Sequence, residues 1–90
     1  MTIYLEIIRS VLEDCRCYRQ QQKDLTALKS AIWNAAEQIT ALEDRELRRK
    51  LQQTEAELDS IQFTTDTEKV FPETLKALEG LETTLAASLR

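Results

Sequence analysis

Apolar side chains recur every three or four positions over the first 42 residues, which is the spacing of one face of an α-helix. A first stripe contains Tyr4, Ile8, Val11, Cys15, Tyr18 and Leu25, with Gln22 at the intervening step. A second stripe contains Leu25, Leu28, Ile32, Ala35, Ile39 and Leu42. Steps of four and three match the heptad repeat of helices that pack along their length. The pattern predicts one helix over residues 2–42, or two helices in a hairpin bent near residues 22–24.

The second half of the chain predicts two further helices. One helix is expected over residues 45–60, with Asp44 as its N-cap, and another over residues 72–88, with Pro72 at its first position because proline lacks a backbone N–H. Their stripes contain Leu47, Leu51, Thr54, Leu58 and Ile61 in the first case, and Phe71, Leu75, Leu78, Leu81, Leu85 and Leu89 in the second. The segment after Ile61 alternates apolar and polar residues, so we expect a short extended link near residues 62–70.

These elements predict an all-α fold of three to four antiparallel helices with coiled-coil-like packing, in a single small domain over residues 1–90. Gly80 and Pro72 are the only glycine and proline, so the chain offers few of the tight turns that sheets need. The apolar share of 42% is typical of a globular chain. No run approaches the roughly 20 apolar residues that span a membrane. The first residues lack the basic segment of a signal peptide, so we expect a cytoplasmic location.

The residue types argue against catalysis and against a metal site. The chain contains no histidine, which is the commonest general base and the commonest metal ligand. Cys15 and Cys17 are two positions apart, so on a helix they point in different directions and cannot form a disulfide. Two cysteines are also too few for a structural zinc site. We therefore expect a non-enzymatic protein with no catalytic residue, no metal and no cofactor, whose Cys17 is a partly exposed reduced thiol.

Charge is unevenly distributed along the chain. The net charge is −4, and residues 1–42 hold five acidic and five basic side chains, so the acidity lies in the second half. An acidic chain repels phosphate, so we expect no direct binding of nucleic acid or of a membrane surface. A basic cluster contains Arg45, Arg48, Arg49 and Lys50. A solvated face is the favoured interpretation of this cluster, and docking of an acidic protein surface is the alternative. Acidic residues follow later in the same helix, an order that opposes the helix dipole.

Large apolar residues outside the first stripe are candidates for binding a partner. The candidate partner-binding residues are Phe63, Val70, Phe71, Leu75, Leu78 and Trp33. A chain this small can complete its core with a partner, and aromatic residues are enriched at interface hot spots. An extended segment around Phe63 could also add to the edge of a partner's sheet. The first stripe, from Tyr4 to Leu25, is the candidate surface for self-association.

The sequence thus indicates a protein–protein interaction module. The favoured interpretation is a small acidic inhibitor, similar in kind to an antitoxin, or an assembly partner that binds another protein through residues 62–90 and its helix faces. The alternative is a self-associating coiled-coil protein with a structural role. The expected partner is another protein or a second copy of the chain, in a homo- or hetero-oligomer.

Overall fold

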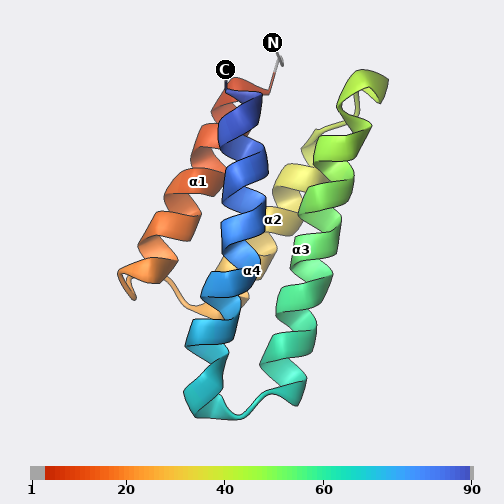
Figure 1. The fold of residues 1–90 in the computed structure, drawn as a ribbon. Helices are drawn as coiled ribbons and strands as arrows, with labels where there is room; N and C mark the ends of the chain where they lie inside the picture. The colour runs from red at the N-terminus through yellow and green to blue at the C-terminus, as the bar shows by residue number, and fades with distance from the viewer. Residues whose placement is uncertain (1–3, 90) are drawn as a thin grey trace.

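The computed structural model describes residues 4–89, which form four α-helices that run alternately up and down in a bundle (Figure 1). The helices are α1 (Leu5–Arg19), α2 (Leu25–Gln38), α3 (Arg45–Thr64) and α4 (Thr67–Ser88), and a 3-10 turn, η1 (Leu42–Asp44), precedes α3. Each helix packs against two others, α1 and α3 both lying against α2 and α4. The predicted all-α fold is confirmed. The expected start of the first helix, at residue 2, lies outside the described residues.

A continuous core fills the space between the four helices. Its fully buried large side chains are Ile8 and Val11 from α1, Leu28 and Ile32 from α2, Ile39 after it, Leu51 and Leu58 from α3, and Leu78, Leu81 and Leu85 from α4. Each such side chain contributes about 1.5–3 kcal/mol by leaving water. The apolar stripes that recur in the sequence are therefore used mainly inside one chain, and only a few large apolar residues remain outside.

The chain reverses direction between α1 and α2, so the hairpin is correct and the single helix over residues 2–42 is wrong. Gln21 has a left-handed backbone with φ of 60°. Its N–H donates to the Tyr18 carbonyl, and the Gln22 N–H donates to the Cys17 carbonyl, each at 2.9 Å. This pair of bonds is the Schellman motif, which satisfies the last carbonyls of a helix and stops it. Asp24 then starts α2, because its Oδ1 accepts from the Ala27 N–H at 2.7 Å.

The link between α3 and α4 is shorter than predicted. Helix α3 continues to Thr64 and α4 begins at Thr67, so only residues 65 and 66 separate them, in place of an extended link near residues 62–70. Ile61 and Val70 both pack against the core. Packing of these side chains on helix faces outweighs the β-propensity of the segment, since propensity is weak compared with burial.

Pro72 lies inside α4 and not at its first position. The missing N–H of Pro72 leaves the carbonyl one turn earlier without its usual helical donor. The extra turn before Pro72 places Phe71 against Tyr18, with ring centroids 5.4 Å apart and planes inclined at 31°. Such an aromatic pair contributes about 0.5–1.5 kcal/mol beyond its burial, which offsets part of the cost of the lost hydrogen bond.

Two aspartates that start helices provide a matched test of the α1–α2 reversal. Asp24 and Asp66 both occupy N-cap positions, but only the Asp24 side chain accepts a hydrogen bond from its helix. We expect Asp24→Ala to lower the free energy of unfolding by about 1 kcal/mol, and Asp66→Ala to lower it by less than about half of that. Both changes remove one negative charge near a helix N-terminus. Urea unfolding followed by circular dichroism measures the difference, and equal losses would contradict the role given to Asp24.

Candidate functional site

Exposed large apolar side chains occur on α2, η1 and α3. Among residues 4–89 they are Trp33 in α2, Leu42 in η1 and Phe63 in the last turn of α3, with exposed fractions of 43%, 75% and 75%. We call the outer surface of α2, η1 and α3 that carries these three residues the α2–α3 face. The large apolar residues of α1 and α4 in the described part of the chain are buried or half-buried.

A hollow of about 540 Å³ lies beside Trp33 on this face. Thr26, Lys29, Ser30, Trp33 and Asn34 line it from α2, and Glu55 lines it from α3. Its lining contains one aromatic ring among polar side chains and opens to solvent. Such a hollow suits a single side chain of a larger partner, because small-molecule sites are mostly apolar and enclosed.

Polar contacts between α2 and α3 hold Phe63 in place. Lys29 Nζ lies 2.8 Å from Asp59 Oδ1 and 5.1 Å from the centroid of the Phe63 ring. One turn away, Gln62 Nε2 donates to Thr26 Oγ1 at 3.2 Å. The cation–π contact contributes about 0.5–1 kcal/mol at an exposed site. Phe63 is therefore in contact with Lys29 while most of its surface stays exposed.

The structure divides the six candidate partner-binding residues into two groups. Phe63 and Trp33 are exposed on the α2–α3 face. Leu78 is fully buried, and Val70, Phe71 and Leu75 are half-buried against the core. Leu78 is enclosed within the chain, because α4 uses its apolar stripe to close the bundle. Helix α4 is packed against α1 and α3.

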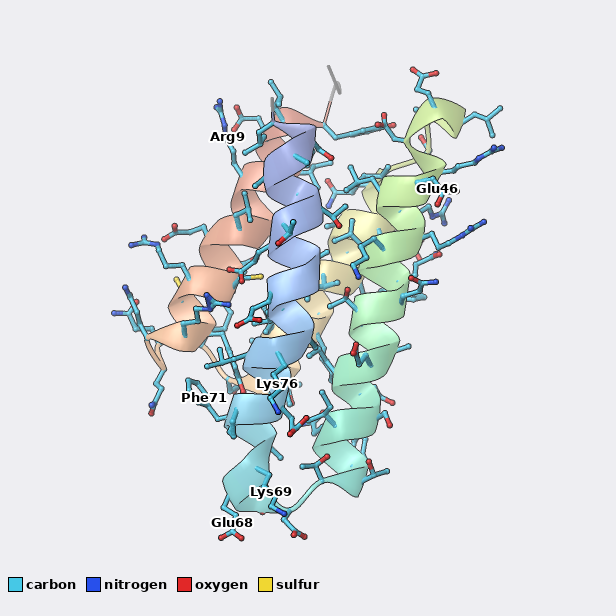
Figure 2. All side chains as sticks on the ribbon, viewed as in Figure 1. Arg9, Glu46, Glu68, Lys69, Phe71 and Lys76 are labelled. Carbon is cyan, nitrogen blue, oxygen red and sulfur yellow. The ribbon has the colours of Figure 1, made fainter. Side chains whose placement is uncertain are left out.

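Phe71 faces a second hollow, of about 460 Å³, near the reversal between α1 and α2. Figure 2 shows Phe71 projecting from the lower part of α4 toward the end of α1. Tyr18 and the polar residues 21–24 complete the lining. Since the Phe71 ring is already packed against Tyr18, this hollow offers less free apolar surface than the α2–α3 face.

The expected self-association stripe forms part of the internal core. Ile8, Val11, Cys15, Tyr18 and Leu25 are all buried within one chain. Tyr4 is half-buried, and its hydroxyl accepts from the N–H groups of Thr40 at 3.2 Å and Ala41 at 3.0 Å. The hydrogen bond with the Thr40 side chain, followed by these two backbone bonds, lowers the pKa of Tyr4. The stripe cannot serve as a surface for a second copy, because α2 and α4 cover it once the chain reverses at Gln21.

The basic cluster lies in the N-terminal half of α3, where Lys50 reaches toward Gly80 of α4. Arg45 and Arg49 are exposed, while Arg48 and Lys50 are half-buried. Arg49 pairs with Glu46 at 3.5 Å, and Figure 2 shows Glu46 among side chains that project outward from this end of α3. Within residues 4–89, no carboxylate lies within 4.0 Å of a charged nitrogen of Arg45, Arg48 or Lys50. The cluster therefore has positive charge available for an external carboxylate.

Sequence reasoning missed Leu42 and the residues that support Phe63. Leu42 was assigned to the second apolar stripe, yet it is 75% exposed. The signal was present, because the step from Leu42 to Leu47 is five residues and breaks the helical spacing. The Lys29–Asp59 contact had no such signal, since its partners are thirty positions apart.

The two thiols differ in environment. Cys15 is fully buried, and burial, reinforced by the negative charge of Glu82, raises its pKa to about 12. Cys17 is half-buried, and its Sγ lies 3.8 Å from Glu13 Oε1.

Within residues 4–89, no three cysteine or carboxylate side chains are grouped so that they could hold a metal ion. The described helices are also too short or too polar to cross a membrane.

Comparison with protein-family models finds no match, and searches of curated proteins and of solved structures find no significant similarity.

The thiol environments predict selective alkylation. With iodoacetamide at pH 8, the folded protein should take up one label, at Cys17, because about one in ten thousand Cys15 side chains is ionised four pH units below its pKa. Unfolding in urea should add the second label. Intact-mass measurement counts the labels, and Cys17→Ser should abolish the first one. Rapid double labelling of the folded protein would show that Cys15 is not enclosed by the core.

Proposed function

We propose that this chain is a non-enzymatic, cytoplasmic protein–protein interaction module that binds its partner through the α2–α3 face. The observation that carries the proposal is the exposure of Trp33, Leu42 and Phe63 on α2, η1 and α3, because the other large apolar residues among 4–89 are buried or half-buried. Aromatic residues of this kind are typical anchors of protein interfaces.

The separation of these residues favours a protein over a small ligand. Leu42 and Phe63 lie at opposite ends of α3, a helix of 20 residues, which corresponds to about 30 Å at 1.5 Å per residue. A molecule that contacts both ends must therefore be large. Nucleic acid is disfavoured by the net charge of −4 and by the acidic second half of α3.

An inhibitor of the antitoxin kind and an assembly partner would both use such a face. An inhibitor or an assembly partner would place helices α2 and α3 against a surface of another protein. Within residues 62–89, Phe63 is the large apolar residue that is exposed and could contact that surface. The non-enzymatic part of the proposal is supported by the lack of histidine in the sequence.

The proposal is tested by comparing variants of the two faces. Tagged wild type, Trp33→Ala and Phe63→Ala are incubated with untagged protein and with lysate of the source cells, and every stoichiometric polypeptide recovered is weighed. Both substitutions should reduce recovery of the partner at least about tenfold, because truncation of an aromatic anchor costs about 2 kcal/mol or more. Both variants should keep the melting temperature within a few degrees, since the side chains are exposed.

Lys76→Ala, on the exposed surface of α4, is the control and should leave recovery unchanged. Binding that survives both aromatic substitutions, or that is lost in the Lys76 variant alone, would place the interface elsewhere and overturn the proposal.

A further inference from the structure

The charge of α3 changes sign midway along the helix. Residues 45–50 hold four bases and one acid, whereas residues 51–64 hold three acids and no base. A helix dipole favours acids near the N-terminus and bases near the C-terminus, so this order disfavours the isolated helix. Glu55 and Glu57 form no ion pair within residues 4–89. The same is true of the bases Arg45, Arg48 and Lys50, whereas Arg49 pairs with Glu46. The two halves of α3 thus present opposite charges to the outside.

Three of these charged residues, Arg45, Arg49 and Asp59, lie along a single outward-facing row. Within the chain, Asp59 also pairs with Lys29. What we call the outer stripe of α3 begins at Leu42 in the preceding turn η1 and continues in α3 with Arg45, Arg49, Gln52, Ala56, Asp59 and Phe63, at steps of three and four residues. Six of them are exposed and Gln52 is half-buried, while Leu47, Leu51, Thr54 and Leu58 face the core. Both ends of the stripe are apolar, and Gln52 lies at its centre. The charged residues before Gln52 are basic, and the charged residue after Gln52 is acidic.

We propose that the outer stripe of α3 binds a second copy of this chain, with the two α3 helices antiparallel about a two-fold axis near Gln52. The inference rests on the proposed function and names the partner of the same face. In this arrangement Arg45 lies opposite Asp59 of the partner subunit, and Leu42 lies opposite the partner subunit's Phe63. Because the axis is two-fold, each contact occurs twice.

Three features of the stripe fit this arrangement. A hollow of about 460 Å³, lined by Leu42, Glu43, Arg45 and Glu46, lies at the end that Phe63 of the partner subunit would reach. Gln52, at the axis, can both donate and accept a hydrogen bond, so it can pair with its own copy, which an isolated charge cannot do. Ala56 is small and leaves room for Arg49 of the partner subunit. A parallel arrangement would instead place bases against bases and acids against acids.

The size of the surface indicates a reversible dimer. A small stable interface covers about 600–800 Å² of each partner, which is about one eighth of the 5643 Å² surface of one chain. One side of a 30 Å helix supplies part of this area, so the surface around Trp33 must contribute the rest. Since the charges are exposed, added salt should weaken the dimer.

Exchanging charges between the two ends of the outer stripe tests whether a second copy binds it and whether the two α3 helices are antiparallel. One variant carries Arg45→Glu and Arg49→Glu, and the other carries Ala56→Lys and Asp59→Lys. Wild type should sediment as a dimer of twice 10.4 kDa. Each variant alone should have a dimer dissociation constant raised by about thirtyfold or more, because like charges then meet at several positions. An equimolar mixture should recover dimers, since each new charge then meets its opposite. Circular dichroism and melting curves verify that both variants fold.

The outcomes separate this inference from the proposed function. Wild type that remains at 10.4 kDa at millimolar concentration would overturn the inference, and so would a dimer that neither variant weakens. Capture of a different protein that depends on Trp33 and Phe63 would in that case leave the proposed function standing. If capture of a different protein did not depend on Trp33 and Phe63, the proposed function would be overturned as well.

A matched pair of cysteine substitutions tests the two-fold axis directly. In a Cys17→Ser background, Gln52→Cys should form an intermolecular disulfide under mild oxidation, because residue 52 lies next to its own copy. Gln53→Cys replaces the same residue type one position away, about 100° around the helix, and should cross-link at least about tenfold more slowly. Equal rates, or faster cross-linking at position 53, would overturn the antiparallel arrangement about Gln52.

Discussion

The reversal of the chain at Gln21 decides which surfaces of this molecule are internal. Two hydrogen bonds from residues 21 and 22 close α1, and the Asp24 side chain opens α2 in the opposite direction. If α1 continued through this point, its apolar stripe would stay open along its whole length. The reversal folds that stripe against α2, and α4 then closes the remaining side. Among the described residues, the large apolar side chains that this closure leaves exposed lie on α2, η1 and α3.

The fold class followed from the sequence because helical spacing of apolar residues is a strong and local signal. The reversal was left open, since residues 20–24 have high helix propensity and Gln21 adopts a left-handed backbone without the glycine that usually marks one. The segment from Ile61 to Pro72 was predicted wrongly for a different reason. Its β-branched residues favour a strand in isolation, but Ile61 and Val70 gain more by packing on helix faces.

The candidate surface was only partly predictable. Trp33 and Phe63 were recognised as candidates from residue type, and their exposure agrees with that role without establishing it. Leu78 had the same signal as Phe63, yet it is buried. A periodic stripe shows that a residue faces something, but it does not show whether another helix of the same chain or a partner covers it. That distinction depends on contacts between distant segments, such as Lys29 with Asp59.

The order of charges on α3 connects the internal packing with the proposed dimer. Helix α3 is held by contacts with both α2 and α4, so its stability does not require charges that suit its own dipole. Its outer charges can therefore be arranged for an external partner at a small cost to the fold. Exposed charge pairs add little affinity, but they strongly disfavour the wrong orientation. On this view the apolar residues at the two ends of the stripe supply the attraction, and the reversal of charge between them selects the antiparallel arrangement.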